Sequence, residues 1–306
     1  MFQALGFEQR SVITSLGRVV YYTAVGSPWQ DEMTASQDKD TLVFLHGFGG
    51  GSSAYEWSKV YPAFAAEYRI LAPDLLGWGF SSHPARSYTI EDYLTTIREF
   101  LQQTCNRAVT VIASSLTAAF TIRLAIASPE LFKSLILTTP AGLADFGQDY
   151  SRSLFAQLVA IPILDRVIYS TGIATEAGIR NFLEQRQFAN PNRVYEEILQ
   201  AYLESARQPN AEYAALSFVR GDLSFDLSLY IQQLTIPTAM IWGQQSQFTG
   251  LEVGRRLAQM NPQAIRFFQA LEDVGLTPQL EVPGVTIGLI RKYLPLLSES
   301  PTALTY

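Results

Sequence analysis

The sequence predicts an α/β protein in which a mostly parallel β-sheet is flanked by helices and carries an inserted helical cap. Short runs of apolar and β-branched residues alternate with helical patterns, which is typical of a parallel sheet covered on both faces. The alternation stops between residues 142 and 233, where helical patterns take over, and then resumes. With 306 residues, 48% hydrophobic and 16% charged, the chain has the composition of one folded α/β core.

The expected strands follow one another along both parts of the core. Residues 11–14 and 18–25 predict a hairpin that turns at 15–17, and the polar stretch 26–40 predicts an exposed loop. Apolar strands are then expected at 41–45, 69–73, 108–113, 134–138, 236–242 and 265–268. Helices are expected between them, including one near 250–261, and a final helix at 283–294 closes the core.

Residues 142–233 form the expected cap, inserted after the sixth strand, while residues 1–141 and 234–306 form the core. Helical patterns in the cap cover 151–161, 176–188, 191–207 and 211–220. The most apolar stretch is 154–169, but Pro162 and Asp165 interrupt it well short of the roughly 20 residues that a membrane span needs. We therefore expect no transmembrane span, and interpret this stretch as a cap helix or as an interfacial helix in peripheral contact with a membrane.

Charge and cysteine content exclude several classes of function. The net charge is −6 and Lys and Arg never form a longer run than a pair, so we expect no nucleic acid partner. Cys105 is the single cysteine, which excludes an internal disulfide and a multi-cysteine metal site. We expect no metal and no cofactor. The first residues do not form a secretory signal, which predicts an intracellular protein, cytoplasmic or peripherally membrane-bound.

Two motifs indicate a family. The strand at 41–45 runs into His46, Gly47, Phe48 and Gly49, which resembles the His-Gly-x-Gly loop of the α/β hydrolases. Residues 74–81 read Asp-Leu-Leu-Gly-Trp-Gly-Phe-Ser and resemble that family's turn after the fourth strand. The resemblance covers essentially the whole chain. It is nearest to the capped group that includes esterases, C–C hydrolases, epoxide hydrolases and haloalkane dehalogenases, and it implies the α/β-hydrolase fold.

The nucleophile of such enzymes follows the fifth strand in a Gly-x-Ser-x-Gly turn, and residues 113–117 read Ala-Ser-Ser-Leu-Thr. The resemblance places Ser115 at the nucleophile position and the amides of Phe48 and Leu116 in the oxyanion hole. Thr117 stands where the turn needs a small residue. A register centred on Ser114 would put larger side chains at both crowded positions. A serine here also argues against epoxide hydrolases and dehalogenases, which use an aspartate.

Both other members of the serine triad are missing. The family's acid lies in Trp-Gly-x-x-Asp after the seventh strand, and Ser246 occupies its place. The histidine lies in Gly-His-x-Pro-x-x-Glu-x-Pro, whereas residues 275–283 read Gly-Leu-Thr-Pro-Gln-Leu-Glu-Val-Pro. Leu276 therefore replaces the histidine. The glycine before it and the prolines and glutamate after it fix the alignment.

Only two histidines exist in the chain, His46 and His83. On the family pattern His46 makes structural hydrogen bonds in the oxyanion turn. His83 lies beyond the fourth-strand turn, where we expect a solvated loop histidine. A serine hydroxyl is a weak nucleophile without a base to take its proton, and losing the triad histidine typically costs about a millionfold in turnover. Ordinary ester hydrolysis is therefore expected to be slight or absent.

Three functions fit this pattern. The leading hypothesis is a non-catalytic protein whose cleft between sheet and cap binds a small apolar ligand or a partner protein. The alternative is a serine-dependent acyl hydrolase with Ser115 as nucleophile and a non-standard base. The third is a scaffold subunit of a larger assembly, held near a membrane through residues 154–169.

Overall fold

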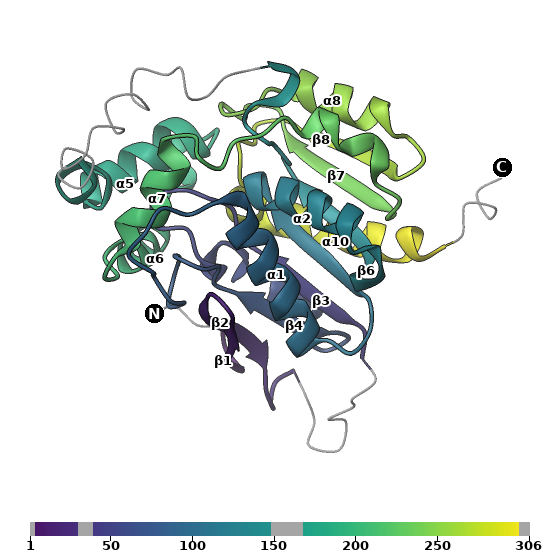
Figure 1. Ribbon diagram of the computed structural model, residues 1–306, viewed down its shortest axis with the longest axis horizontal. Helices are drawn as coiled ribbons and strands as arrows, with labels where there is room; N and C mark the ends of the chain where they lie inside the picture. The colour runs from purple at the N-terminus through teal and green to yellow at the C-terminus, as the bar shows by residue number, and fades with distance from the viewer. Residues whose placement is uncertain (1–3, 30–38, 148–167, 300–306) are drawn as a thin grey trace.

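An eight-stranded sheet forms the centre of the molecule in the computed structural model, which describes residues 4–29, 39–147 and 168–299 (Figure 1). The strands lie in the order β1-β2-β4-β3-β5-β6-β7-β8. Only β1 with β2 and β2 with β4 pair antiparallel, and all other neighbours are parallel. The strands are β1 Phe7–Thr14, β2 Gly17–Ala24, β3 Thr41–Leu45, β4 Arg69–Pro73, β5 Val109–Ser114, β6 Phe132–Thr138, β7 Thr238–Gly243 and β8 Ile265–Leu271.

All the expected strands are present, and the two edge strands, β1 and β8, are longer than expected. The central strands β3 and β5 are buried along their whole length, so their sequences are continuous apolar runs. The edge strands have many exposed or half-buried side chains, and polar residues occupy those positions. Apolar runs therefore locate the centre of the sheet well and underestimate its edges.

Helices cover both faces of the sheet. On one face α1 (Ile90–Thr104), α2 (Ser115–Ala127) and α8 (Leu251–Met260) contribute to the larger apolar core. On the other face α10 (Pro283–Ser298) packs with the 3-10 helices η2 (Ala54–Trp57) and η3 (Tyr61–Phe64). The start of α1 is fixed by a capping box, in which the Thr89 side chain and Asp92 satisfy each other's backbone amides.

Between β6 and β7 the described chain contains helices and no strand of the sheet. These are α5 (Glu176–Phe182), α6 (Glu196–Ala206) and α7 (Ala211–Val219), which lie together beside one end of the sheet (Figure 1). A third apolar core joins α5 and α6 to Tyr55 and Leu280. The helix expected at 151–161, and most of the apolar stretch 154–169, fall outside the described residues. The division into core and cap stays a prediction.

Two of the expected cap helices are interrupted. Residues 176–188 form α5 and then a π-helical turn, η8 (Leu183–Gln187), while 191–207 form the 3-10 turn η9 (Pro191–Arg193) and then α6. Val194 and Tyr195 have extended backbone between η9 and α6. The apolar spacing of helical residues does not register such breaks, because the buried side chains continue on the same face.

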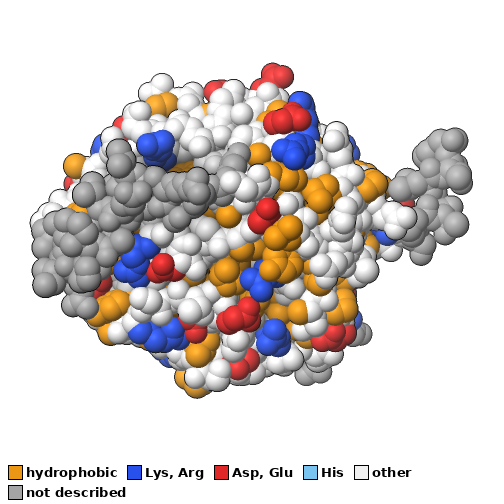
Figure 2. Space-filling view, turned by 45° about the horizontal axis from the view of Figure 1, so that its top comes forward, with side chains coloured by type: hydrophobic (Ala, Val, Ile, Leu, Met, Phe, Trp, Pro, Cys, Tyr) orange, Lys and Arg blue, Asp and Glu red, His pale blue; other side chains and the backbone are white. Residues whose placement is uncertain are grey.

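Within the described ranges, no helix is long and apolar enough to cross a membrane. On the face shown in Figure 2, Lys and Arg side chains are interspersed with Asp and Glu and form no continuous basic area.

Candidate functional site

The predicted nucleophile lies at a sharp strand-to-helix junction. β5 ends at Ser114, which has ordinary extended dihedrals, and α2 begins at Ser115, whose φ is +55°. A non-glycine residue in this left-handed region is strained, and such strain persists only where the surrounding structure enforces it. The backbone therefore singles out Ser115 rather than Ser114 as the centre of the turn. Thr117 is accommodated fully buried in the first turn of α2, and its hydroxyl has no hydrogen-bond partner among the described residues.

The turn after β3, which we predict to form the oxyanion hole, lies directly against this serine. A Cβ placed on Gly47 would lie 3.3 Å from the Cβ of Ser115. Phe48, the next residue, is buried, and its ring stacks on Trp78. Neither the Phe48 amide nor the Leu116 amide, which is in the first turn of α2, has a hydrogen-bond partner among the described residues. Two backbone donors without a described partner thus lie in the residues next to Gly47 and Ser115 along the chain.

Helices α5 and α6 of the predicted cap pack against the glycines of the same loop. A Cβ on Gly51, whose φ is +96°, would lie 2.2 Å from the backbone oxygen of Tyr202 in α6. A Cβ on Gly49 would lie 2.8 Å from the ring of Phe182 in α5. A side chain at Gly51 would therefore displace the backbone of α6, and one at Gly49 would displace the ring of Phe182. The ring of Phe182 also contacts Phe248, with centroids 6.1 Å apart, so it links the oxyanion loop to the loop after β7.

The predicted acid and histidine positions lie on adjacent loops. The Gln245 amide donates to the Val274 carbonyl at 3.0 Å, which joins the loop after β7 to the loop after β8. Ser246 is buried, and its hydroxyl has no partner among the described residues. Leu276 is also buried, and its amide donates to the Gln187 carbonyl at 2.8 Å. The structure therefore joins the two loops that carry these positions, and the assignment of Ser246 and Leu276 to the triad stays a prediction.

Both ring nitrogens of His46 make structural hydrogen bonds, as predicted. Its Nδ1 lies 2.7 Å from the Gly47 carbonyl oxygen, and its Nε2 accepts the Leu75 amide at 3.0 Å. These partners fix the neutral tautomer with the proton on Nδ1. Burial lowers the pKa of His46 to about 4. Both ring nitrogens are used, so this histidine has no free nitrogen to offer Ser115.

The expectation of a solvated His83 is wrong. The residue is half-buried, its Nε2 donates to the Gly79 carbonyl oxygen at 3.0 Å, and burial lowers its pKa. Asn210, at the start of α7, donates to the His83 carbonyl. Asn210 therefore contacts a loop that the sequence presents as exposed. No hydrogen bond joins either histidine to Ser115 in the described part of the chain.

Sequence reasoning missed a fully buried carboxyl beside the turn. Glu56 accepts the Gly47 amide at 2.9 Å and the Tyr202 hydroxyl at 3.1 Å, and no described cation pairs with it. Its Oε2 would lie 3.5 Å from a Cβ on Gly47, the same point that approaches Ser115. Burial raises the pKa of Glu56, against the opposing effect of its hydrogen bonds, and so favours the neutral acid. A single charged residue in the apolar run Ala-Tyr-Glu-Trp was the available signal.

This carboxyl belongs to a polar network that connects the cap to the turn. Gln187 donates to the Tyr202 hydroxyl at 2.7 Å and to Thr277 at 3.3 Å. On the other side, Gln279 donates to the Ser114 hydroxyl at 3.1 Å. The loop that would carry the triad histidine thus contacts the serine turn through an amide, which cannot accept a proton from Ser115 as an imidazole would.

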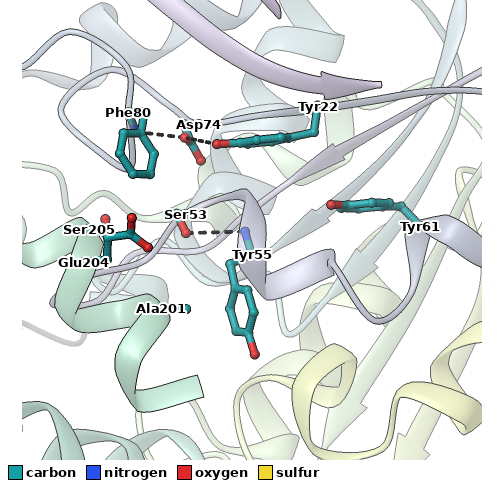
Figure 3. Close-up of a pocket in the computed structure, with 9 residues that line it drawn as sticks. All are labelled: Tyr22, Ser53, Tyr55, Tyr61, Asp74, Phe80, Ala201, Glu204 and Ser205. Atoms are coloured by element: carbon teal, nitrogen blue, oxygen red, sulfur yellow. Dashed lines mark hydrogen bonds between the residues drawn. The ribbon is translucent and has the colours of Figure 1, made fainter. Parts of the chain in front are cut away.

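A small cavity of about 20 Å³ lies elsewhere, between α6 and residues of β2, η2, η3 and the turn after β4 (Figure 3). Asp74 accepts the amides of Ala54 and Phe80 and the hydroxyl of Tyr22, and burial raises its pKa to about 6. Glu204 and Ser205 of α6 face it from the cap. None of its nine lining residues is a predicted site residue. The space suits a water molecule and is too small for an organic substrate.

Among residues 4–29, 39–147 and 168–299, no group of three or more His, Cys, Asp or Glu side chains is placed to hold a metal ion.

Comparison with known proteins identifies the class and then the family. The model of the α/β hydrolase fold family matches residues 40–281, and the chain therefore belongs to this family. An epoxide hydrolase, CorEH, has a similar structure, with a TM-score of 0.75 at 21% identity, over 95% of this chain and 99% of that one. At that identity the similarity shows the fold alone, which confirms the predicted fold class.

Relatives by sequence include named hydrolases. A 2-hydroxy-6-oxononadienedioate/2-hydroxy-6-oxononatrienedioate hydrolase of Cupriavidus pinatubonensis is 25% identical over 236 residues, which are 74% of this chain and 77% of that protein. The uncharacterized protein Rv2715 of Mycobacterium tuberculosis is 30% identical over 102 residues. That match spans 33% of this chain and 29% of the relative.

Proposed function

We propose that this member of the α/β hydrolase fold family binds a small, largely apolar molecule beneath the cap and does not hydrolyse esters through a serine triad. The observation that supports this most is the apolar residue at the position predicted for the triad histidine. Leu276 stands at the histidine position, and the only two imidazoles of the chain are hydrogen-bonded to backbone groups away from Ser115. Without a base, the serine keeps its proton.

The side chains around the predicted site favour an apolar ligand. Leu276 is buried next to the loop that carries Ser246, and the rings of Phe182 and Phe248 meet beside the oxyanion loop. Apolar walls with a few placed polar groups are typical of small-molecule sites.

The test is to purify the full-length protein and identify retained molecules by native mass spectrometry and solvent extraction. We expect a stoichiometric small molecule. The variant Leu276→Trp should retain less of it, because the added bulk fills the site, whereas Leu229→Trp, at a position that is 70% exposed, should retain as much as wild type. Protein that is always empty of a small molecule would contradict the proposal.

A serine-dependent acyl hydrolase with a non-standard base is the second candidate, and one observation favours it. Ser115 keeps the strained φ of +55°, and the amides of Phe48 and Leu116 have no partner among the described residues. The comparison of wild type with Ser115→Ala on short p-nitrophenyl esters decides between the two candidates. Equal slow rates support the binding protein, and a rate that depends on the serine supports the hydrolase.

A further inference from the structure

Three buried carboxyls lie where the core meets one part of the predicted cap, residues 187–206, which we call the α6 segment. Glu56 accepts a tyrosine hydroxyl of α6 at 3.1 Å, and Glu281 accepts the Ala189 amide at 2.9 Å. Asp74 faces α6 across the small cavity of Figure 3. These carboxyls come from η2, from the segment after β8 and from the turn after β4. Three separate parts of the core therefore present an acid to the same segment.

These carboxyls have little positive charge beside them. Glu56 and Asp74 are buried, and neither forms an ion pair with a residue in the described ranges. Glu281 is also buried, and Arg193, whose Nη1 lies 3.7 Å from it, pairs with Asp273 as well. Taking a carboxylate out of water costs free energy unless a cation compensates for it. Burial accordingly raises the pKa of all three groups, that of Asp74 to about 6 and that of Glu281 to about 7.

The other titratable groups around these acids do not supply a positive charge at neutral pH. Burial raises the pKa of Tyr22, Tyr61 and Tyr202, so these phenols stay neutral. Burial lowers the pKa of His46 to about 4, and this imidazole is therefore neutral as well. Burial also lowers the pKa of His83, so protonation of this residue would disfavour the closed packing at low pH, which is the opposite pH dependence.

Helix α6 itself adds negative charge to the contact, and its sequence contains no Lys or Arg. Glu204 faces Asp74 across the cavity (Figure 3), so ionisation of Asp74 places two carboxylates on opposite sides of one small space. Glu197 accepts the hydroxyl of Tyr55, and Lys59 lies 3.8 Å from the same carboxylate. The single nearby lysine therefore pairs with α6 and not with the buried acids.

The α6 segment covers the turn beside Ser115. A Cβ on Gly51 would lie 2.2 Å from the backbone oxygen of Tyr202, and the Gly79 amide donates to the Ser205 hydroxyl at 3.0 Å. Movement of α6 away from the core would therefore uncover the turn after β3.

We infer that the contact between the α6 segment and the core is a proton-controlled latch, closed while Glu56, Asp74 and Glu281 are protonated and open when they are ionised. This inference goes beyond the proposed function and requires no ligand. In the open state water solvates the carboxylates, so the closed state binds the protons more tightly.

The sign of the pH dependence follows from the raised pKa values. Each acid stabilises the closed state fully below its ordinary pKa, which is 3.8 for Asp74 and 4.5 for Glu281. This stabilisation is lost as the pH rises through about 6 for Asp74 and about 7 for Glu281. The latch should therefore open as the pH rises through neutrality.

Hydrogen–deuterium exchange of the full-length protein from pH 5 to pH 8 tests the latch, with each amide rate compared with its intrinsic rate at the same pH. Each pKa unit that is relieved on opening changes the opening equilibrium about tenfold. We expect the protection of the α6 amides to fall by at least about tenfold over this range, while the protection of α2 stays constant.

Two variants identify the acids responsible. Glu56→Gln and Glu281→Gln keep the size of the side chain and remove the ionisation. Each should shrink the fall in α6 protection by about threefold or more, and the double variant should shrink it most. Asp74 is left intact because its oxygens accept two backbone amides of the core. Glu130→Gln, at an exposed position between α2 and β6, is the control and should behave as wild type.

Three results would overturn the inference. The first is equal protection of α6 at pH 5 and pH 8 in wild type, which needs no variant to fold. The second is an equal loss of protection in α2, because the pH effect would then be global unfolding. The third is a wild-type pH profile in both single variants.

Discussion

The two sides of the predicted site differ: one has the backbone geometry that the family resemblance implies, and the other lacks the side chains that it implies. At the ends of β3 and β5, the turn at Gly47 lies against the strained Ser115 at the start of α2. At the ends of β7 and β8, Ser246 and Leu276 stand at the positions that we predict for the acid and the histidine of a triad. The first side is defined by backbone geometry, which also supports the packing of sheet and cap. The second depends on two side chains that the fold does not need.

The comparison is tested most strongly by introducing a histidine and an aspartate at the two predicted triad positions. Leu276→His combined with Ser246→Asp should raise the rate of p-nitrophenyl ester hydrolysis by at least about a hundredfold, since a missing triad histidine typically costs about a millionfold. The same double variant carrying Ser115→Ala should stay at the wild-type rate. An unchanged rate in a folded double variant would show that a further block exists, and adding Thr117→Gly tests the crowded position of the turn.

The polar network should contribute measurably to stability. Tyr202→Phe removes the hydroxyl that joins Glu56 to Gln187 and leaves both groups buried without that partner. We expect a loss of about 1–3 kcal/mol in the free energy of unfolding, measured by urea denaturation. Tyr195→Phe, in an exposed position before α6, is the matched control and should change stability by less than about 0.5 kcal/mol. Equal effects would mean that the network is not a structural connection.

The free energy of unfolding should also depend on pH through Glu281, which follows Leu276 in the segment after β8. Glu281 accepts the amides of Gly275 and Ala189, and burial raises its pKa from 4.5 to about 7. The folded state thus binds the proton more tightly than the unfolded state. Its stabilising effect is complete below pH 4.5 and is lost as the pH rises through about 7.

The change for this group is about 3 kcal/mol at most. Urea denaturation at several pH values should therefore show a flatter profile for Glu281→Gln than for wild type. If wild type and Glu281→Gln lost stability in parallel as the pH rises, the raised pKa of Glu281 would be contradicted.

The smallest expected effect on stability concerns the hydroxyl of Ser246, at the position predicted for the triad acid. Ser246→Ala removes a buried hydroxyl without a described partner and should be neutral or stabilising by up to about 1 kcal/mol. Ser134→Ala removes a hydroxyl that bonds Thr110 at 2.8 Å and should destabilise by about 1 kcal/mol. Thermal unfolding of the pair compares them directly. A marked loss in Ser246→Ala would reveal a partner for that hydroxyl.

Sequence reasoning located most of the sheet because buried strands leave a local pattern, and a local motif also carries the prediction for Ser246 and Leu276. Buried parallel strands are apolar runs, and the motif residues around Leu276 are close together in the chain. The strained turn at Ser115 was likewise indicated by a short motif.

The polar network could not be found in this way. The bond from Tyr202 to Glu56 joins residues 146 positions apart, and no periodicity relates them. The burial of His83 was missed for a similar reason, since part of its cover comes from Asn210 in the cap. Contacts made by tertiary packing of distant segments leave no spacing in the sequence to read.

The reactivity of Ser115 toward a fluorophosphonate probe tests the central claim most directly, because the reaction needs an activated serine and no knowledge of the substrate. With labelling followed by mass spectrometry from pH 6 to 9, the account predicts no more modification of Ser115 in wild type than of other serines, and rapid modification once Leu276→His and Ser246→Asp are introduced. Rapid modification of Ser115 in the wild-type protein would contradict it.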